Sequence, residues 1–205
     1  MKVTVFDYGA GNLHSLVKAL EGAGIEVGVE TDPVRAVSRE TDVLVLPGVG
    51  AFGAAADRLA PGREAMRAAI SGGLPTIGIC LGMQLLFDGS DEGPGSGLGV
   101  IPGRVTRLQT ARVPQIGWNE VTPVSGDPVF GAAPVPMAYY ANSYVCRPAS
   151  AAVVAAWTDH EGDRFPAAVR AGRAVGVQFH PEKSSAPGVA FLHAFLRDAR
   201  TTERS

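Results

Sequence analysis

The stretch Gly78-Ile79-Cys80-Leu81-Gly82 joins two segments of different character. The apolar run Pro75–Cys80 is typical of a buried strand, and Leu81–Phe87 is predicted to be a helix. A nucleophile at such a turn is held in a strained, exposed position, and flanking glycines relieve the crowding. The helix N-terminus favours a thiolate at Cys80, and the amide of Leu81 would face an oxyanion. A lone cysteine is more often a small buried hydrophobic residue, but the glycine spacing and this context favour a nucleophile.

The segments around this turn alternate between strand-like and helix-like patterns. Short apolar runs predict strands at 2–6, 25–30, 42–46 and 174–179. Helices are predicted at 13–20 with Asn12 as the N-cap, at 54–70 with a break at Pro61-Gly62, and at 187–200. Near-continuous apolar strands separated by helices are typical of a parallel sheet covered on both faces.

The second half of the chain has a different pattern. Successive strands joined by Pro/Gly turns are expected at 105–108, 118–122, 137–146, 153–158 and 167–170, and they predict an antiparallel extension of the sheet. The glycine-rich stretch 89–99 is expected to be a flexible surface loop. The length of 205 residues favours a single domain, 1–200, with a disordered tail at 201–205.

Composition excludes several classes of function. With 46% hydrophobic and 19% charged residues the chain is too apolar for a disordered protein, and a formal net charge of -2 predicts no strong attraction to nucleic acid or membrane. No export signal or membrane span is recognisable, so the cytoplasm is the expected location. The two cysteines form no CxxC pattern and the four histidines lack zinc-ligand spacing, so neither a disulfide nor a metal site is expected.

A base for the cysteine is expected in Gln178-Phe179-His180-Pro181-Glu182. In extended chain, residues two apart point to the same side, so Glu182 can orient the His180 ring toward Cys80. The alternative is that these two residues merely end a strand and cap a helix. We favour a catalytic arrangement because Cys80 and His180 both follow predicted strands of one sheet, where active sites collect in open α/β folds.

Two glycine-rich turns near the N-terminus need separate interpretations. In Pro47-Gly48-Val49-Gly50 the glycines would let the Val49 peptide rotate, so its amide could complete an oxyanion hole with Leu81, although this tetrapeptide alone favours an ordinary tight turn. Gly9-Ala10-Gly11 lacks the third glycine of a dinucleotide fingerprint, since His14 stands in its place. No cofactor is therefore expected.

Taken in order, the PGxG turn, the cysteine elbow and the His-Pro-Glu element resemble the class I glutamine amidotransferases. The resemblance spans nearly the whole chain and implies a flavodoxin-like three-layer α/β/α sandwich, with a mostly parallel central sheet and an antiparallel extension. The chain is most similar to the glutaminase subunits of imidazole glycerol-phosphate synthases in histidine biosynthesis, as four motifs indicate: Asp7-Tyr8-Gly9-Ala10-Gly11-Asn12, Pro47-Gly48-Val49-Gly50-Ala51-Phe52, Pro114-Gln115-Ile116-Gly117-Trp118-Asn119 and His180-Pro181-Glu182-Lys183-Ser184.

The resemblance also implies roles for individual residues. Cys80, His180 and Glu182 would form the catalytic triad. Glutamine would be surrounded by Gly50, Gln84, Glu92, Ser143 and Tyr144. Asn12, Trp118 and Lys183 would face a cyclase subunit, a (β/α)8 barrel that forms a heterodimer with this chain and uses the ammonia. Asn142 departs from the family, which usually has histidine there.

Three alternatives remain open at this point. The chain could be the glutaminase subunit of another synthase, such as one for pyridoxal phosphate or anthranilate, because the triad is common to the family. It could be a cysteine hydrolase of the same fold that acts on other amides. A non-enzymatic regulator is the least favoured, because such proteins normally lack a triad residue and none is missing here.

Overall fold

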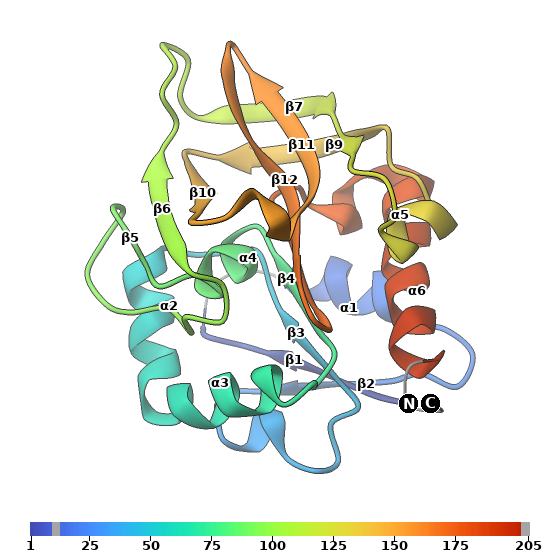
Figure 1. Cartoon of the computed structure of the whole chain (residues 1–205). Coiled ribbons are helices and arrows are strands. Elements are labelled where there is room, and N and C mark those ends of the chain that lie inside the picture. Colours follow the sequence, from blue (N-terminus) through green and yellow to red (C-terminus); the bar gives the residue numbers. More distant parts are fainter. Residues whose placement is uncertain (10–12, 202–205) are drawn as a thin grey trace.

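A computed structural model describes residues 1–9 and 13–201, and its core is one eight-stranded sheet (Figure 1). The strands lie in the spatial order β2 (Glu26–Glu30), β1 (Lys2–Phe6), β3 (Val43–Leu46), β4 (Thr76–Ile79), β13 (Ala174–Val177), β12 (Asp163–Ala171), β11 (Val154–His160) and β8 (Thr122–Pro123). Neighbours from β2 to β13 are parallel, and those from β13 to β8 are antiparallel. The predicted mostly parallel sheet with an antiparallel extension is confirmed.

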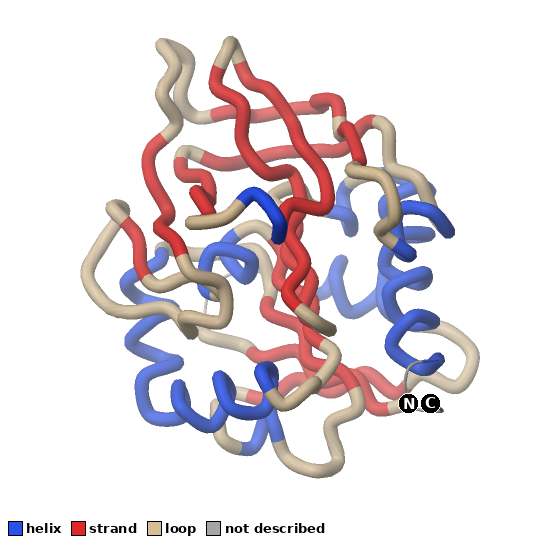
Figure 2. Tube along the Cα trace, viewed as in Figure 1, coloured by secondary structure: helices blue, strands red, loops and turns tan. Residues whose placement is uncertain are grey.

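Helices cover both faces of the parallel half (Figure 2). One face packs against α1 (His14–Leu20), α5 (Pro128–Ala132) and α6 (Ser185–Thr201), and the other against α2 (Phe52–Leu59), α3 (Arg63–Ser71) and α4 (Leu81–Leu85). Alternate strand residues divide between the two cores, as the two-residue repeat of a strand requires: Val43 and Val45 join the first, and Leu44 and Leu46 the second.

The helix predictions hold, with shifted ends. The expected break at Pro61-Gly62 is a 3-10 turn, η2 (Ala60–Gly62), between α2 and α3. The last helix, α6, runs Ser185–Thr201, so Thr201 is helical and not part of the expected disordered tail. Residues 202–205 and the proposed cap Asn12 lie outside the described residues. Helix α5 was not predicted from the sequence, although Asp127 is a typical N-cap, whose side chain accepts from the amides of Val129 and Phe130, and Pro128 follows it as the first helical residue. Further 3-10 turns are η1 (Arg35–Val37), η3 (Ala151–Val153) and η4 (Pro181–Lys183).

Two smaller sheets lie above the carboxyl ends of the parallel strands (Figure 1). One contains β10 (Tyr144–Pro148), β6 (Gly103–Arg107) and β5 (Gly89–Ser90), and the other is a ribbon of β7 (Gln115–Glu120) and β9 (Met137–Asn142). The single strand predicted at 137–146 is therefore wrong. The chain bends at Ser143, because β9 pairs with β7 whereas β10 pairs with β6.

The stretch 89–99 also differs from the expected flexible surface loop. It starts as β5, and Leu98 is buried, with its amide donating to the Leu85 carbonyl at 2.7 Å. A Cβ at Gly97 would lie only 2.1 Å from the Phe87 carbonyl oxygen. Close packing against the chain around α4, rather than flexibility, explains this glycine.

Candidate active site

Cys80 lies at a sharp turn between β4 and α4. Its backbone has φ 47° and ψ −103°, a conformation that non-glycine residues rarely adopt. The turn is possible only with glycine on both sides: a Cβ at Gly78 would be 2.5 Å from the Gly82 carbonyl oxygen, and one at Gly82 would be 2.0 Å from that of Leu46. The Cys80 amide donates to the Val177 carbonyl at 2.7 Å, which fixes the turn to β13.

His180 and Glu182 form a buried pair just beyond the end of β13, the strand that pairs with β4. The Nδ1 of His180 lies 2.8 Å from Oε1 of Glu182, and because a carboxylate only accepts, the ring donates this hydrogen bond. The expected extended geometry of the three residues is wrong, since η4 begins directly after His180. A tight helical turn, rather than alternation along a strand, brings the carboxylate back to the ring.

Protonation of His180 is strongly favoured by these neighbours. Burial by itself lowers the pKa of the ring, but hydrogen bonds with Cys80 and Glu182 and the negative charge of both outweigh it and raise the pKa to about 10. The ring therefore carries a proton at neutral pH when the cysteine is a thiolate.

The position of His180 depends on a serine that the sequence analysis did not single out as a positioning residue. Ser184 is fully buried, its hydroxyl donates to the His180 carbonyl at 2.6 Å, and it accepts from the Tyr139 amide at 2.9 Å. The His180 amide in turn donates to the Tyr139 carbonyl at 2.8 Å. Two contacts thus attach the histidine backbone to β9. The role of Ser184 is visible only in the structure, because Tyr139 of β9 is far from it in the sequence.

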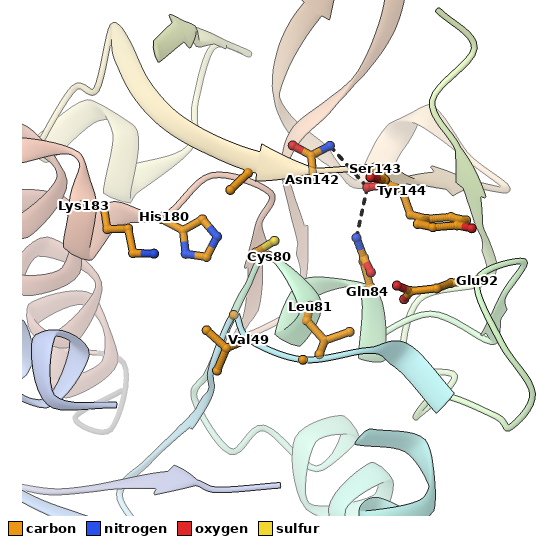
Figure 3. A pocket seen from close by; sticks show the side chains of 13 residues that line it. Val49, Cys80, Leu81, Gln84, Glu92, Asn142, Ser143, Tyr144, His180 and Lys183 are labelled. Carbon is orange, nitrogen blue, oxygen red and sulfur yellow. Dashed lines mark hydrogen bonds between the residues drawn. The ribbon is translucent and has the colours of Figure 1, made fainter. Parts of the chain in front are cut away.

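Cys80 and His180 border a cavity of about 360 Å³ (Figure 3). Most of the other residues that the sequence analysis proposed for the site also line it: Val49, Gly50, Leu81, Gln84, Glu92, Ser143, Tyr144 and Lys183. Gly48 belongs to the wall too, and a Cβ there would approach His180 Cε1 to 2.9 Å and Cys80 Cβ to 3.1 Å. The turn at 47–50 therefore packs directly against the reactive side chains.

Polar groups converge on the end of the cavity opposite His180. The amide of Gln84 donates to the Tyr144 carbonyl at 3.0 Å, and Asn142 donates to the same oxygen at 3.3 Å. Glu92 accepts from the Phe52 amide at the start of α2, at 2.9 Å. A carboxylate at one end and a thiol at the other suit an amino acid that binds by its ammonium group and reacts at its side chain.

The proposed partner-facing residues are dispersed. Trp118 does not line the cavity. It projects from β7 with 51% of its surface exposed, and its ring meets that of Tyr139 edge to face, with the ring centroids 6.4 Å apart. Lys183 lies in the cavity wall, and Asn12 is outside the described residues. Within residues 1–9 and 13–201, no group of three or more His, Cys, Asp or Glu side chains is arranged to hold a metal ion. None of the helices in those ranges has the length and apolar character needed to cross a membrane.

The family model for class I glutamine amidotransferases matches residues 4–199. The imidazole glycerol phosphate synthase subunit HisH of Halobacterium salinarum is 42% identical over 95% of this chain and 92% of its own length. The same subunit of Thermus thermophilus is 43% identical over 94% and 95%.

Solved structures of lower identity share the fold. PurLQS from Thermotoga maritima superposes with a TM-score of 0.70 at 20% identity, covering 96% of this chain and 98% of that one. A glutamine amidotransferase from the same organism gives a TM-score of 0.65 at 18% identity, covering 100% and 86%.

Proposed function

The chain belongs to the class I glutamine amidotransferase family, and from this premise we propose that it is the glutaminase subunit of an imidazole glycerol phosphate synthase. It hydrolyses glutamine to glutamate and passes the ammonia to a cyclase subunit in histidine biosynthesis. One observation carries this most directly: His180, hydrogen-bonded to Glu182, borders a cavity of amino-acid size together with Cys80.

The first half-reaction is acyl transfer to sulfur. The thiolate of Cys80 attacks the side-chain amide carbon of glutamine, and the amides of Val49 and Leu81 stabilise the oxyanion. The imidazolium of His180 then gives its proton to the departing amino group. Ammonia leaves and a γ-glutamyl thioester remains. The raised pKa of His180 keeps this proton available at neutral pH.

The second half-reaction restores the enzyme. His180, now neutral, takes a proton from water as the water attacks the thioester, and the carbon–sulfur bond breaks to release glutamate and the thiolate. Glu182 steadies the ring in both steps through its 2.8 Å contact to Nδ1. Glu92 binds the α-ammonium group of the substrate, and Gly50, Gln84, Ser143 and Tyr144 enclose the rest of it.

The cyclase, a (β/α)8 barrel, docks on the outer face of the β7–β9 ribbon. Ile116 and Trp118 are 68% and 51% exposed on this face, which is unusual for large apolar side chains and typical of an interface. Ala141, opposite Ile116 on β9, also borders the cavity, so the docking face and the reactive centre share a strand. Lys183, in the cavity wall, faces the same partner.

The test is glutamine hydrolysis by the chain alone and by the chain mixed with the cyclase and its ribonucleotide ligand. We expect a low rate alone and a large increase with the loaded partner, because the glycines around Val49 allow its peptide to turn toward the oxyanion. Equal rates would exclude this activation. Activation by a pyridoxal phosphate or anthranilate synthase instead would identify a different partner.

Trp118→Ala tests the docking face, with Val29→Ala as the matched control. Val29 is 52% exposed on the edge strand β2, at the opposite end of the sheet from β8 and away from the ribbon. Loss of a central aromatic side chain typically weakens binding by about 10- to 100-fold. The tryptophan variant should therefore bind the cyclase more weakly in titration calorimetry, whereas the valine variant should bind like the wild type.

A further inference from the structure

A buried glutamine lies beside the reactive sulfur. Gln178 directly follows β13, as Cys80 directly follows β4, and these two strands pair in parallel with Gly176 opposite Gly78 and Val177 opposite Ile79. Gly78 and Gly176 both face α4, against which an added Cβ would collide. The register therefore places Cys80 and Gln178 side by side at the carboxyl ends of the two strands.

The side chain of Gln178 uses this position. Its Nε2 lies 3.5 Å from the Sγ of Cys80, within the range for a hydrogen bond to sulfur, and the residue has no solvent exposure. Its Oε1 is buried and has no hydrogen-bond partner among the described residues. A buried amide with one unpaired end opposes folding, and an apolar side chain of the same size would avoid that cost.

Backbone pairing does not require this amide. The main-chain amide of Gln178 donates to the Ala167 carbonyl at 2.8 Å whatever its side chain is. Methionine has almost the same length and volume and would fill the site without an unpaired polar atom. What the glutamine adds is a donor aimed at the nucleophile.

We propose that Gln178 donates a hydrogen bond to the Cys80 thiolate, and so is a fourth side chain of the catalytic site that keeps the nucleophile charged and aimed into the cavity. The proposal rests on the proposed function only in taking Cys80 as the nucleophile. Hydrogen bonds to a charged group favour the charged form.

Gln178 and His180 act on the sulfur in different ways. His180 must give up its proton to the leaving ammonia and later take one from water, so its charge changes within each turnover. The amide of Gln178 cannot lose its proton and remains a donor throughout. Its bond weakens when the sulfur becomes a neutral thioester and strengthens again as the carbon–sulfur bond breaks, which stabilises the departing thiolate.

The test is the pH dependence of Cys80 alkylation by iodoacetamide in the full chain, with the modified residue identified by peptide mass. In Gln178→Met the midpoint of the profile should move to higher pH by about one unit, so that alkylation below the midpoint is roughly tenfold slower. Gln115→Met is the control, since Gln115 is also buried with both amide atoms unpartnered in the described structure. It should leave the midpoint unchanged. A wild-type midpoint in Gln178→Met would overturn the proposal.

Two further measurements keep the proposal falsifiable. Gln178→Glu places an oxygen against the sulfur, so its midpoint should rise further than that of the methionine variant. If neither variant folds, the side-chain amide resonances of Gln178 in the wild type should shift over the same pH range as Cys80 alkylation. Resonances that stay fixed would overturn the proposal. Because alkylation needs no glutamine, this outcome is independent of whether glutamine is the substrate.

Discussion

The two cysteines of this chain occupy regions that differ in everything except burial. Cys80 is 6% exposed at the turn between β4 and α4, and Cys146 is fully buried in the middle of β10, opposite Val105 of β6. Exposure therefore hardly separates them. Cys80 has the His180 ring and the Gln178 amide as partners, whereas Cys146 packs in an apolar cluster with Leu85, Phe87 and Val105.

The surroundings decide what each sulfur can do. Burial raises the pKa of the Cys146 thiol well above its usual range; the nearby charge of Cys80 raises it further, and Arg147 only partly offsets this. Cys146 stays a neutral apolar group. At Cys80 the strained backbone aims the sulfur at the cavity, where the Gln178 amide and the His180 ring lie beside it. Backbone geometry and donors, rather than access to solvent, are therefore what distinguish Cys80 as the proposed nucleophile.

The largest expected effect is the loss of glutamine turnover when Cys80 is replaced. Cys80→Ala should abolish glutamine-dependent synthesis by the complex, because no other group can form the thioester. Synthesis fed by ammonium salts should remain, since that step belongs to the cyclase. Cys146→Ala is the matched control and should retain glutamine use. Residual glutamine turnover in Cys80→Ala would assign the nucleophile to another residue.

The next effect concerns the turn that makes Cys80 reactive. Gly82→Ala should destabilise the fold by more than about 4 kcal/mol, since the new Cβ would lie 2.0 Å from a backbone oxygen that cannot move aside. Gly131→Ala in α5 is the control: nothing lies within 4 Å of that Cβ, and alanine should be neutral or slightly stabilising there. Urea unfolding of both variants measures the difference. Similar midpoints would show that the turn tolerates a side chain.

A smaller effect should follow from Glu182→Gln, which removes one group that raises the pKa of His180. Turnover should fall by about 10²-fold, as for loss of a partner that assists acid–base catalysis. The imidazole titration, followed by NMR, should move down from about 10. An unchanged titration would mean that Cys80 alone sets it.

The same shift has a consequence for stability. Because the folded pKa of His180 lies above the unfolded value, the protonated ring stabilises the fold fully below about pH 6.5 and loses this contribution as the pH rises toward about 10. In Glu182→Gln the loss should occur at lower pH. Melting temperatures of the wild type and of Glu182→Gln, measured across this pH range, show where each protein loses the stabilisation.

The smallest effect is expected at Cys146. Cys146→Ser replaces a buried sulfur in an apolar cluster with a hydroxyl and should cost about 1–3 kcal/mol of stability. Glutamine turnover should remain close to wild type at temperatures where the variant is folded. A loss of turnover without a loss of stability would link Cys146 to the reaction and weaken the contrast between the two thiols.

Features encoded over a few residues were predictable. Gly78 and Gly82 around Cys80 indicated the elbow because each glycine relieves a clash with nearby chain, and the break at Pro61-Gly62 in the helix follows from local chemistry in the same way. The parallel orientation of the strands in the first half followed from their apolar composition and from the helices between them. The contact between His180 and Glu182 was predicted correctly, but for the wrong reason: the prediction assumed extended chain, whereas the structure has the 3-10 turn η4 there.

Features that depend on pairing between distant strands were not predictable. Nothing local distinguishes 137–146 from one continuous strand, yet Ser143 turns the chain from one sheet to another and brings Tyr144 to the cavity. The glycines of 89–99 suggested flexibility because their packing partners, such as Phe87, are visible only in three dimensions. Ser184 acquires its role only where β9 passes His180.

The sequence by itself determined which residues could be proposed as catalytic and which local turns present them, because glycine spacing, caps and apolar runs act over a few residues. The tertiary structure alone decided that Gln178 lies against the sulfur of Cys80, ninety-eight residues away, and that Cys146 does not become a second nucleophile. The reason is physical: strand register and burial are set by the whole sheet, and they fix which donors reach a thiol and how much its charge costs.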